Sequence, residues 1–282
     1  MTDTTLVPLI SLERWAEQFE ANAKAYQSAS PYPYAQFEDF LEGWAAKKAM
    51  EAFPKVKDEG WIHYLHVNEK KHGLNKMDMI PPFLQEVIRA LNSDAFVKIL
   101  SQLTGIDGLK ADPSLEGGGL HQSQRGGFLN IHADFTVHPH KRNWRRRVNL
   151  LIYLNEDWKE EYRGELQLWS RDMKRCEQKI SPVYNRCVIF NTDEDSYHGL
   201  PDPIQCPEEM TRKSIALYYF TEETEAPRKR ATNYKARPGD GLKSIAIYLD
   251  KKAVEVYNTL KGRLGLNDDF VSSLLNRFNR KK

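Results

Sequence analysis

Apolar side chains recur every three or four residues in the first third of the chain, the spacing of one buried face of an α-helix. This pattern predicts helices over residues 11–26, 35–53, 82–92 and 93–105. Pro54 ends the second of these helices, and Ser93 is a good N-cap for the fourth. We therefore expect residues 1–110 to form a helical region that packs on the rest of the protein.

The spacing of apolar residues changes from helical to two-residue alternation at about residue 115. Strand-like runs follow at 128–135, 147–155, 164–169, 186–191 and 212–221. Short strands in succession, without helices between them, favour an antiparallel sandwich or barrel. We expect a β core over residues 111–225, followed by a mainly helical extension over 226–282. In that extension we expect a short strand at 244–249 and helices at 250–261 and 267–279.

The run at 147–155 has two different faces. Val148, Leu150, Ile152 and Leu154 share one face, which is wholly aliphatic, because alternate residues of a strand point the same way. The opposite face carries Arg147, Asn149, Leu151 and Tyr153. We expect the aliphatic face to pack under helices and the polar face to line a cavity inside a barrel.

Composition and charge narrow the function classes. The 282 residues are 40% hydrophobic and 28% charged, as in an ordinary globular protein with a sizeable core. The 41 basic and 39 acidic residues give a net charge of +2, too balanced to suggest a nucleic-acid partner. The longest apolar run, at 150–154, is far shorter than the roughly 20 residues of a membrane helix. No signal peptide is apparent either, so we expect no membrane partner.

The cysteine content points to a cellular compartment. Cys176, Cys187 and Cys206 are an odd number with no CxxC spacing. This argues against both a disulfide framework and a cysteine zinc site. We therefore expect a reducing, cytoplasmic location.

His132 stands out among the histidines because Asp134 follows it by two residues in a predicted strand. Both side chains project from one face, so an imidazole and a carboxylate converge. A third ligand would complete the facial triad of two histidines and one carboxylate that binds Fe(II) and leaves open coordination positions. His198, at a turn after an apolar run, is the best candidate for that third ligand.

Arg212 and Ser214 open a later strand and share one of its faces. A buried arginine without a carboxylate partner is costly. Its planar guanidinium is well suited to a carboxylate that a ligand supplies. The alternative is a surface pair, Arg212 and Lys213, at the start of the strand, and the preceding metal motif makes that alternative the weaker one.

Together, these residues form a pattern: His132-x-Asp134, then His198, then Arg212-x-Ser214. It resembles the Fe(II)/2-oxoglutarate-dependent oxygenases, specifically their prolyl-4-hydroxylase-like branch. The resemblance covers roughly residues 93–222. The stretch at 153–158, Tyr-Leu-Asn-Glu-Asp-Trp, is similar to the hypoxia-type prolyl hydroxylases.

The resemblance implies a mainly β fold with flanking helices, whose core is a double-stranded β-helix, the cupin-like jelly roll. It implies that His132, Asp134 and His198 are the catalytic residues that bind Fe(II). It implies that Arg212, assisted by Ser214 and the Tyr153 hydroxyl, binds the distal carboxylate of 2-oxoglutarate. O2 would be the second co-substrate and ascorbate an optional reductant.

Two departures from the family pattern refine these implications. Collagen-type enzymes have a lysine where Arg212 stands, so this chain fits the arginine form. Residues 201–210 lengthen the gap before Arg212, which makes its register less secure than that of the triad. In contrast to the related halogenases, which replace the carboxylate with a small residue, this chain keeps Asp134. Halogenation is therefore disfavoured, and hydroxylation is the expected outcome, with desaturation and ring closure left open.

Residues for substrate binding are less well defined. His121 and Gln122 precede His132 by about ten residues, and Asn149 shares the inward face with Tyr153, so we expect these three to line the cavity. The basic segment 141–147 either attracts an anionic substrate or is a solvated loop. Arg147 begins its strand and is expected to point inward, with Arg142, Arg145 and Arg146 exposed.

Three functions remain open at this point. The first is an Fe(II)/2-oxoglutarate hydroxylase of a small, biosynthetic molecule, which we favour. The second is a protein or peptide prolyl hydroxylase with the same chemistry. The third is a metal-binding jelly roll without activity, although such a module has no need to keep both the triad and Arg212. The substrate and the oligomeric state stay undetermined.

Overall fold

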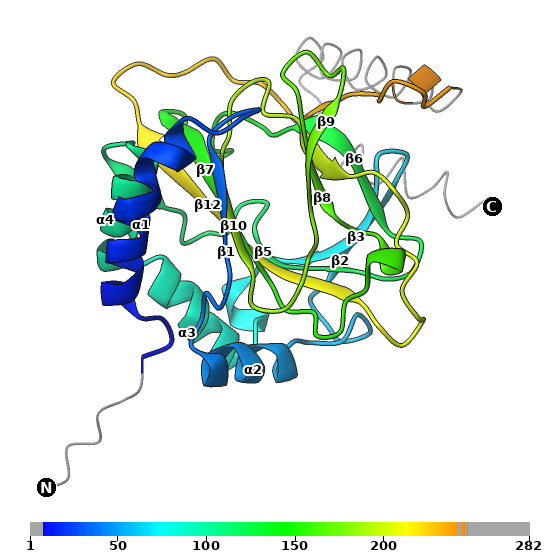
Figure 1. The fold of residues 1–282 in the computed structure, drawn as a ribbon, viewed down its shortest axis with the longest axis horizontal. Coiled ribbons are helices and arrows are strands. Elements are labelled where there is room, and N and C mark those ends of the chain that lie inside the picture. Colours follow the sequence, from blue (N-terminus) through cyan, green and yellow to red (C-terminus); the bar gives the residue numbers. More distant parts are fainter. Residues whose placement is uncertain (1–7, 242–243, 246, 248–282) are drawn as a thin grey trace, which may run out of the picture.

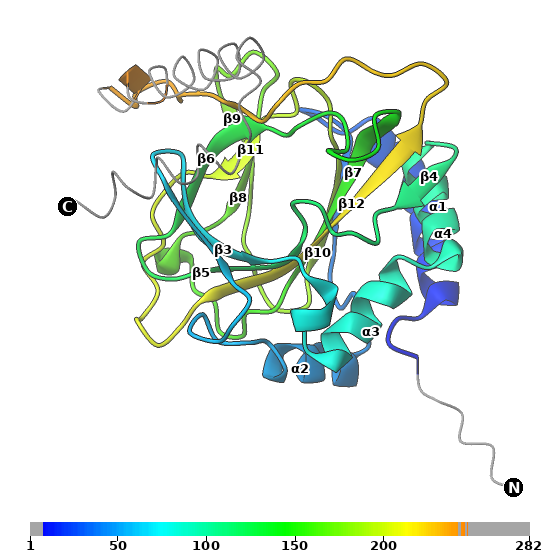
Figure 2. The same cartoon turned by 180° about the vertical axis from the view of Figure 1, so that it is seen from behind.

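The computed structural model describes residues 8–241 together with 244, 245 and 247, and shows four α-helices beside a curled sheet (Figures 1 and 2). The α-helices are α1 (Leu12–Gln27), α2 (Gly43–Glu51), α3 (Pro82–Leu91) and α4 (Asp94–Thr104). Short 3-10 helices cover Met77–Met79 and Glu160–Tyr162. Figure 1 shows α1 and α4 side by side on one face of the sheet, with α2 and α3 below them.

Local signals in the sequence explain where the helices begin and end. The Ser93 side chain accepts a hydrogen bond from the Phe96 amide at 3.3 Å and so caps α4. The same helix ends at Gly105, whose φ of 67° is the left-handed conformation that glycine adopts most readily. Ser11 caps α1 in the same way, and Pro81 and Pro82 begin α3. The predicted helices at 11–26, 82–92 and 93–105 are confirmed to within two residues.

Thirteen strands form a single sheet among the described residues. They are β1 (Tyr34–Phe37), β2 (Ile62–His66), β3 (Glu69–Leu74), β4 (Leu109–Ala111), β5 (Gly119–Ser123), β6 (Phe128–Ala133), β7 (Trp144–Tyr153), β8 (Leu166–Trp169), β9 (Cys176–Ile180), β10 (Cys187–Asn191), β11 (His198–Leu200), β12 (Arg212–Glu222) and β13 (Asn233–Tyr234). The paired strands are antiparallel. Neighbouring strands in the sheet follow the order β1-β10-β7-β12-β5-β3-β6-β11-β8-β9. The predicted antiparallel core and its jelly-roll class are confirmed.

The strand β3 joins the two halves of this curled sheet. Its residues His72, Gly73 and Leu74 pair with β5, whereas Glu69 and Lys70 pair with β6. The sheet therefore bends around a central space, and residues from both halves face each other across it. This bend brings side chains that are far apart in the sequence to one cavity.

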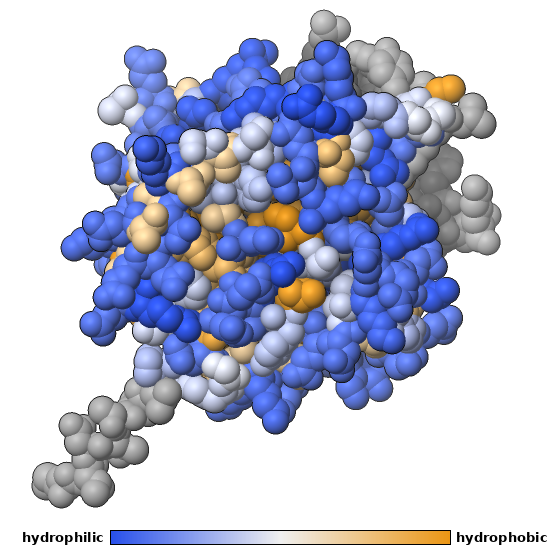
Figure 3. Space-filling view, viewed as in Figure 1, coloured by the Kyte–Doolittle hydropathy of each residue, from blue (hydrophilic) through white to orange (hydrophobic). Residues whose placement is uncertain are grey.

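The core lies between the sheet and the helices, as the pattern of β7 predicted. Val148, Leu150, Ile152 and Leu154 are fully buried and belong to one apolar cluster with side chains of α1, α3 and α4. Burial of this face removes a large apolar area from water, at about 25 cal/mol per Å². The face shown in Figure 3 is mainly hydrophilic, with small apolar areas between polar residues.

The N-terminal region is less helical than expected. Residues 34–37, at the start of the predicted helix over 35–53, form β1, and helix α2 begins only at Gly43. No strand was expected at β2 or β3. The residues of β3 are mostly polar because Glu69 and Lys71 on one face line a polar cavity and Lys70 on the other face is exposed. The alternation of apolar and polar residues that marks most strands is therefore missing.

The C-terminal expectations are mostly outside the described residues. The helices at 250–261 and 267–279 lie there entirely. Residues 244, 245 and 247 are helical, so the strand expected at 244–249 is wrong at these positions. Among the described residues, no helix combines the length and apolar character needed to cross a bilayer.

Candidate active site

The predicted metal ligands come together at the centre of the curled sheet. His132 of β6 and His198 of β11 are direct cross-strand partners, and their ring centroids are 4.5 Å apart. The carboxylate of Asp134 lies between them: its Oδ1 is 3.5 Å from the His132 Nε2, and its Oδ2 is 3.4 Å from the His198 Nε2. One ligand atom from each residue lies within 4.8 Å of the others. This is the only such group with three or more potential ligands in the described part of the chain.

Backbone carbonyls fix the orientation of both imidazoles. The Nδ1 of His132 lies 2.9 Å from the Asn130 carbonyl, and the Nδ1 of His198 lies 2.9 Å from the Ser196 carbonyl. A carbonyl only accepts hydrogen bonds, so each Nδ1 is a protonated nitrogen and each Nε2 is directed toward Asp134. Burial, followed by the nearby His198, lowers the pKa of His132 and keeps its ring neutral. Metal-bound histidines are held in this way.

Asp134 is held on its other side by Arg146 and Asn149. The Arg146 Nη2 lies 2.9 Å from the Asp134 Oδ2, and the Asn149 amide donates to the same oxygen at 2.8 Å. Arg146 also donates from Nε and Nη2 to the Asn149 Oδ1, at 3.0 and 2.7 Å. Burial by itself would raise the pKa of Asp134, but the Arg146 guanidinium and the two imidazoles outweigh burial and hold the pKa well below its usual range. The carboxylate is therefore ionised and fixed in orientation.

The inward position of Arg146 contradicts our expectation for the basic segment. Arg146 is 2% exposed and lines the cavity, whereas Arg147 points outward toward Glu223. The cause is a β-bulge in β7: Tyr219 pairs with Val148, but the next residue, Phe220, pairs with Arg146. The extra residue, Arg147, reverses the alternation of side chains beyond it. Arg146 also stacks on Tyr218, with its guanidinium carbon 3.4 Å from the ring centroid.

Arg212 lines the cavity, and Tyr153 lies beside it. Arg212 is 6% exposed and donates from Nε to the Gly164 carbonyl at 2.7 Å, and no carboxylate of a described residue pairs with it. Its guanidinium carbon lies 4.8 Å from the ring centroid of Tyr153. The buried Tyr153 hydroxyl has no hydrogen-bond partner among the described residues. Ser214 is the cross-strand partner of Tyr153 and lines the cavity.

These groups fit a carboxylate ligand. A guanidinium without an anion and a hydroxyl without a partner are both costly to bury. A carboxylate that enters from the cavity satisfies both groups at once. Burial raises the pKa of Tyr153, with Arg212 partly opposing it, so the hydroxyl stays protonated and can donate. The role of Arg212 toward 2-oxoglutarate stays a prediction.

Of the residues that we expected to line the cavity for substrate binding, some do so and one does not. His121 and Asn149 line the cavity, but Gln122 does not. Gln122 follows His121 on β5, so it points to the opposite face, where its amide donates to the Thr211 hydroxyl at 2.6 Å. Our expectation that both residues line the cavity is therefore wrong for Gln122.

A family comparison decides the class of this site. Residues 118–220 match the family model described as the 2OG-Fe(II) oxygenase superfamily. The matched stretch contains His132, Asp134, His198 and Arg212, which the fold brings to one cavity. Residues 118–220 therefore form a 2OG-Fe(II) oxygenase core. Fe(II) and 2-oxoglutarate are the cofactor and co-substrate of this superfamily, as the resemblance implied.

Two solved structures with TM-scores above 0.5 support the jelly-roll fold. A Pseudomonas putida prolyl-4-hydroxylase superposes with a TM-score of 0.54 and 16% identity, covering 73% of this chain and 100% of that one. A Phytophthora capsici prolyl 4-hydroxylase gives 0.52 and 20% identity, covering 79% and 70%. A Trichoplax adhaerens prolyl hydroxylase, in complex with a peptide fragment, gives 0.49 and 18%, covering 74% and 90%. A search of curated proteins found no match.

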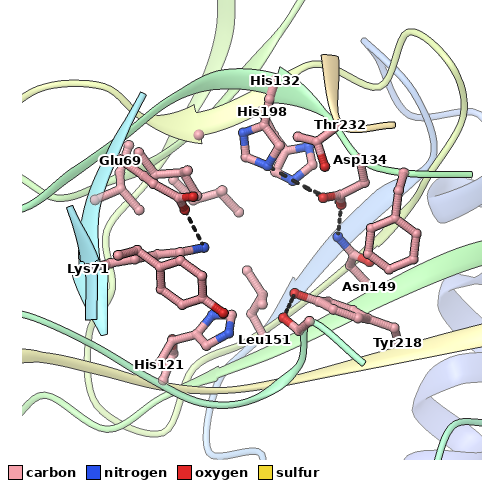
Figure 4. Close-up of a pocket in the computed structure, with 18 of the residues that line it drawn as sticks. Glu69, Lys71, His121, His132, Asp134, Asn149, Leu151, His198, Tyr218 and Thr232 are labelled. Atoms are coloured by element: carbon pink, nitrogen blue, oxygen red, sulfur yellow. Dashed lines mark hydrogen bonds and ion pairs between the residues drawn. The ribbon is translucent and has the colours of Figure 1, made fainter. Parts of the chain in front are cut away.

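The oxygenase also has lining residues that the sequence did not reveal. Glu69 and Lys71 come from β3, and Thr232 and Tyr234 come from the segment that includes β13 (Figure 4). β13 pairs with Ala133 and His132 of β6, which places Tyr234 against the metal site. Its ring centroid is 5.4 Å from that of His132. A polar strand and a two-residue strand carry no periodic signal, so only the fold could assign these residues.

Proposed function

We propose that this oxygenase uses O2 to hydroxylate an unactivated C–H bond of a small molecule, with one oxygen atom entering the product and the other entering succinate as 2-oxoglutarate is converted to succinate and CO2. One observation carries the choice of a small molecule: the cavity is small. It encloses about 190 Å³, below the roughly 300–1,000 Å³ typical of sites for drug-sized ligands. Thr232 and Tyr234, on a segment that returns across β6, form part of its wall.

Within this proposal, His132, Asp134 and His198 hold Fe(II). Two neutral imidazoles and one carboxylate are the donor set that non-haem Fe(II) oxygenases use, and three protein ligands leave positions open. When bound, the metal and its co-substrate supply the oxidising chemistry. Arg212 binds the distal carboxylate of 2-oxoglutarate, and Tyr153 and Ser214 donate hydrogen bonds to it.

The rest of the cavity excludes water from the reacting centre. Leu151, Leu166 and Phe190 line it, and the ring centroid of Phe190 lies 4.7 Å from that of His198. An apolar wall beside the metal keeps solvent away and strengthens the electrostatic contacts of Arg212 and Arg146. Hydroxylation therefore occurs on the part of the substrate that reaches this wall.

The alternatives have less support. A protein substrate requires a groove that admits an extended chain, and the segment with Thr232 and Tyr234 narrows the opening on the β6 side. A metal-binding module without activity gains nothing from burying Arg212 without a carboxylate and the Tyr153 hydroxyl without a hydrogen-bond partner among the described residues. We also propose a cytoplasmic location, which the three free cysteines support because thiols persist in reducing compartments.

Metal binding and co-substrate turnover test this assignment. We expect the full chain to bind one Fe(II) under anaerobic calorimetry and to form succinate slowly without substrate. Alanine at His132, Asp134 or His198 should abolish both. The control is His140→Ala, because His140 is a nearby exposed histidine that pairs with Glu116 outside the cavity. Unchanged metal binding in Asp134→Ala would refute the assignment.

A further inference from the structure

An ion pair lies on the cavity wall that faces Asp134. Glu69 and Lys71 are two residues apart on β3, so both side chains project from one face of the strand. The Lys71 Nζ is 3.2 Å from the Glu69 Oε2, and both residues line the cavity (Figure 4). Their side chains are 18% and 17% exposed. The pair is therefore partly desolvated, yet open to a ligand inside the cavity.

The other polar groups on this wall are neutral. Burial lowers the pKa of His121 to about 3, so its imidazole is uncharged at neutral pH. Burial also raises the pKa of Tyr64, which keeps that hydroxyl protonated. The Tyr64 ring lies beside Lys71, with its centroid 5.3 Å from the Nζ. Glu69 and Lys71 are thus the charges that this wall offers to a substrate.

The remaining charged groups of the cavity already have roles. Arg146 is paired with Asp134, and Arg212 is assigned to the co-substrate. A substrate therefore meets one cation and one anion that are paired with each other. The net charge of this wall is zero. A charged ligand must therefore either separate Lys71 from Glu69 or interact with both of them.

The charge on the substrate decides whether breaking the pair is favourable. A ligand with only a carboxylate would pair with Lys71 but leave Glu69 beside a like charge. A ligand with only an amine would leave Lys71 without a partner. Both cases strand a partly buried charge, which is unfavourable. A zwitterion forms two new ion pairs in place of the one that it breaks.

We propose that Glu69 and Lys71 bind a substrate that carries an ammonium group and a carboxylate close together, as a free amino acid does. Lys71 pairs with its carboxylate and Glu69 with its ammonium group. The rest of the substrate then extends across the cavity toward the triad. This proposal names the substrate class of the function proposed above and rests on it.

Binding measurements on the full chain test the proposal without turnover. The protein is loaded with Zn(II) and 2-oxoglutarate, and calorimetry measures binding of the twenty standard amino acids, β-alanine and 4-aminobutanoate. We expect at least one of them to bind. Its carboxamide, which lacks the carboxylate, and its N-acetyl derivative, which lacks the ammonium group, should each bind at least about 30-fold more weakly, as when one partner of a buried pair is removed.

Variants on β3 separate the ion pair from general effects on the strand. Lys71→Met should weaken binding of the amino acid by at least about 30-fold and remove its preference over the carboxamide. Glu69→Gln should remove the preference over the N-acetyl derivative. Lys70→Met is the matched control, because Lys70 is exposed and points to the opposite face of the same strand. It should bind like the parent protein.

The outcomes distinguish failure of the zwitterion proposal from failure of the oxygenase function on which it rests. If Zn(II) and 2-oxoglutarate bind but no probe does, the zwitterion proposal is wrong and the oxygenase function stands. Equal binding of an amino acid and its carboxamide, or equal effects of Lys70→Met and Lys71→Met, would also overturn it. If neither Zn(II) nor 2-oxoglutarate binds, the function proposed above fails instead.

Discussion

The buried polar side chains around the cavity differ in whether other groups of the folded protein form hydrogen bonds or ion pairs with them. Asp134 receives hydrogen bonds from both Arg146 and Asn149. Arg212, in contrast, bonds the Gly164 carbonyl through Nε alone, and the Tyr153 hydroxyl has no partner among the described residues. Buried groups in native proteins are usually paired, so unpaired ones indicate where a ligand binds. In the proposed function, Arg212 and Tyr153 therefore bind the distal carboxylate of 2-oxoglutarate.

Replacing Arg212 should weaken co-substrate binding without affecting the metal. Loss of one partner of a buried charge-assisted pair costs about 2–5 kcal/mol, or roughly 30- to 4,000-fold in affinity. We expect Arg212→Ala to raise the Kd for 2-oxoglutarate by this factor, with Zn(II) affinity unchanged, in calorimetry of the two ligands separately. Lys213→Ala is the neighbouring control. A large effect of Lys213→Ala and none of Arg212→Ala would mean that the co-substrate binds elsewhere.

At the scale of elements, irregularities in two strands position the metal site. The bulge at Arg147 in β7 turns Arg146 inward, onto Asp134. The short strand β11 lies against β6 so closely that His198 and His132 face each other. Bulges are common next to active sites because they redirect a side chain without breaking the sheet. Both features concern backbone geometry, and each predicts the effect of a substitution.

Arg146 should matter for metal binding, and Arg147 should not. Residues that orient a metal ligand typically contribute about 10- to 100-fold in metal affinity. Removing one partner of a buried ion pair also destabilises a protein by about 3–5 kcal/mol. We expect Arg146→Met to show both effects in Zn(II) titration and urea unfolding, and Arg146→Lys to show smaller ones. Arg147→Met, on the solvent side of the bulge, should show neither. Equal metal affinities for the two methionine variants would contradict the role of the bulge.

Gly199 should be required for the contact between β11 and β6. A Cβ at this position would lie 2.7 Å from the Leu129 carbonyl oxygen and 2.9 Å from that of Asn130. Backbone atoms cannot move aside cheaply, and overpacking of this kind costs about 1–3 kcal/mol. We expect Gly199→Ala to lower the free energy of unfolding by this amount and to weaken Zn(II) binding, because His198 moves with β11. Gly43→Ala, where a Cβ meets nothing within 4 Å, should not destabilise the protein.

At the scale of the whole molecule, the curled sheet encloses ionisable groups in its interior. Burial lowers the pKa of His121 to about 3, and burial together with His198 lowers that of His132. The unfolded chain binds protons at these positions below about pH 6.5, whereas the folded protein does not. The free energy of unfolding is therefore not reduced by these histidines above pH 6.5, and it decreases as the pH falls from 6.5 toward 3. Asp134 adds nothing in the upper part of this range, because its stabilising effect is lost only near and below the ordinary pKa of a carboxyl group.

Mild acid should thus destabilise the protein through His121. At pH 5.5, one unit below the ordinary pKa of histidine, the loss at this residue is about 1 kcal/mol relative to pH 7.5. Urea unfolding with a chelator present should show that His121→Asn loses about 1 kcal/mol less than the parent between these two pH values. His140→Asn, which changes an exposed histidine, should lose as much as the parent. An identical loss in His121→Asn and the parent would mean that His121 is protonated in the folded protein.

The sequence alone determined the parts of this protein that depend on local periodicity and on single motifs. Apolar spacing predicted α1 and the aliphatic face of β7, because burial of one face imposes a period, and proline and capping signals predicted α3 and α4. The His132-x-Asp134 spacing brought two predicted ligands to one side of a strand, and the alternation along that strand needs no knowledge of the fold. The resemblance to 2-oxoglutarate oxygenases then linked these residues to His198 and Arg212.

Only the tertiary structure decided which side chains share the cavity with them. Arg146 replaced Arg147 as the inward arginine because a bulge depends on the pairing partner, Phe220, which is 74 residues away in the printed sequence. Gln122 turned away because the neighbouring strands fix the register of β5. Glu69 and Lys71 belong to a strand without an apolar face, and its place between β5 and β6 follows from long-range hydrogen bonds. Long-range pairing leaves no local periodicity, so the sequence could not show it.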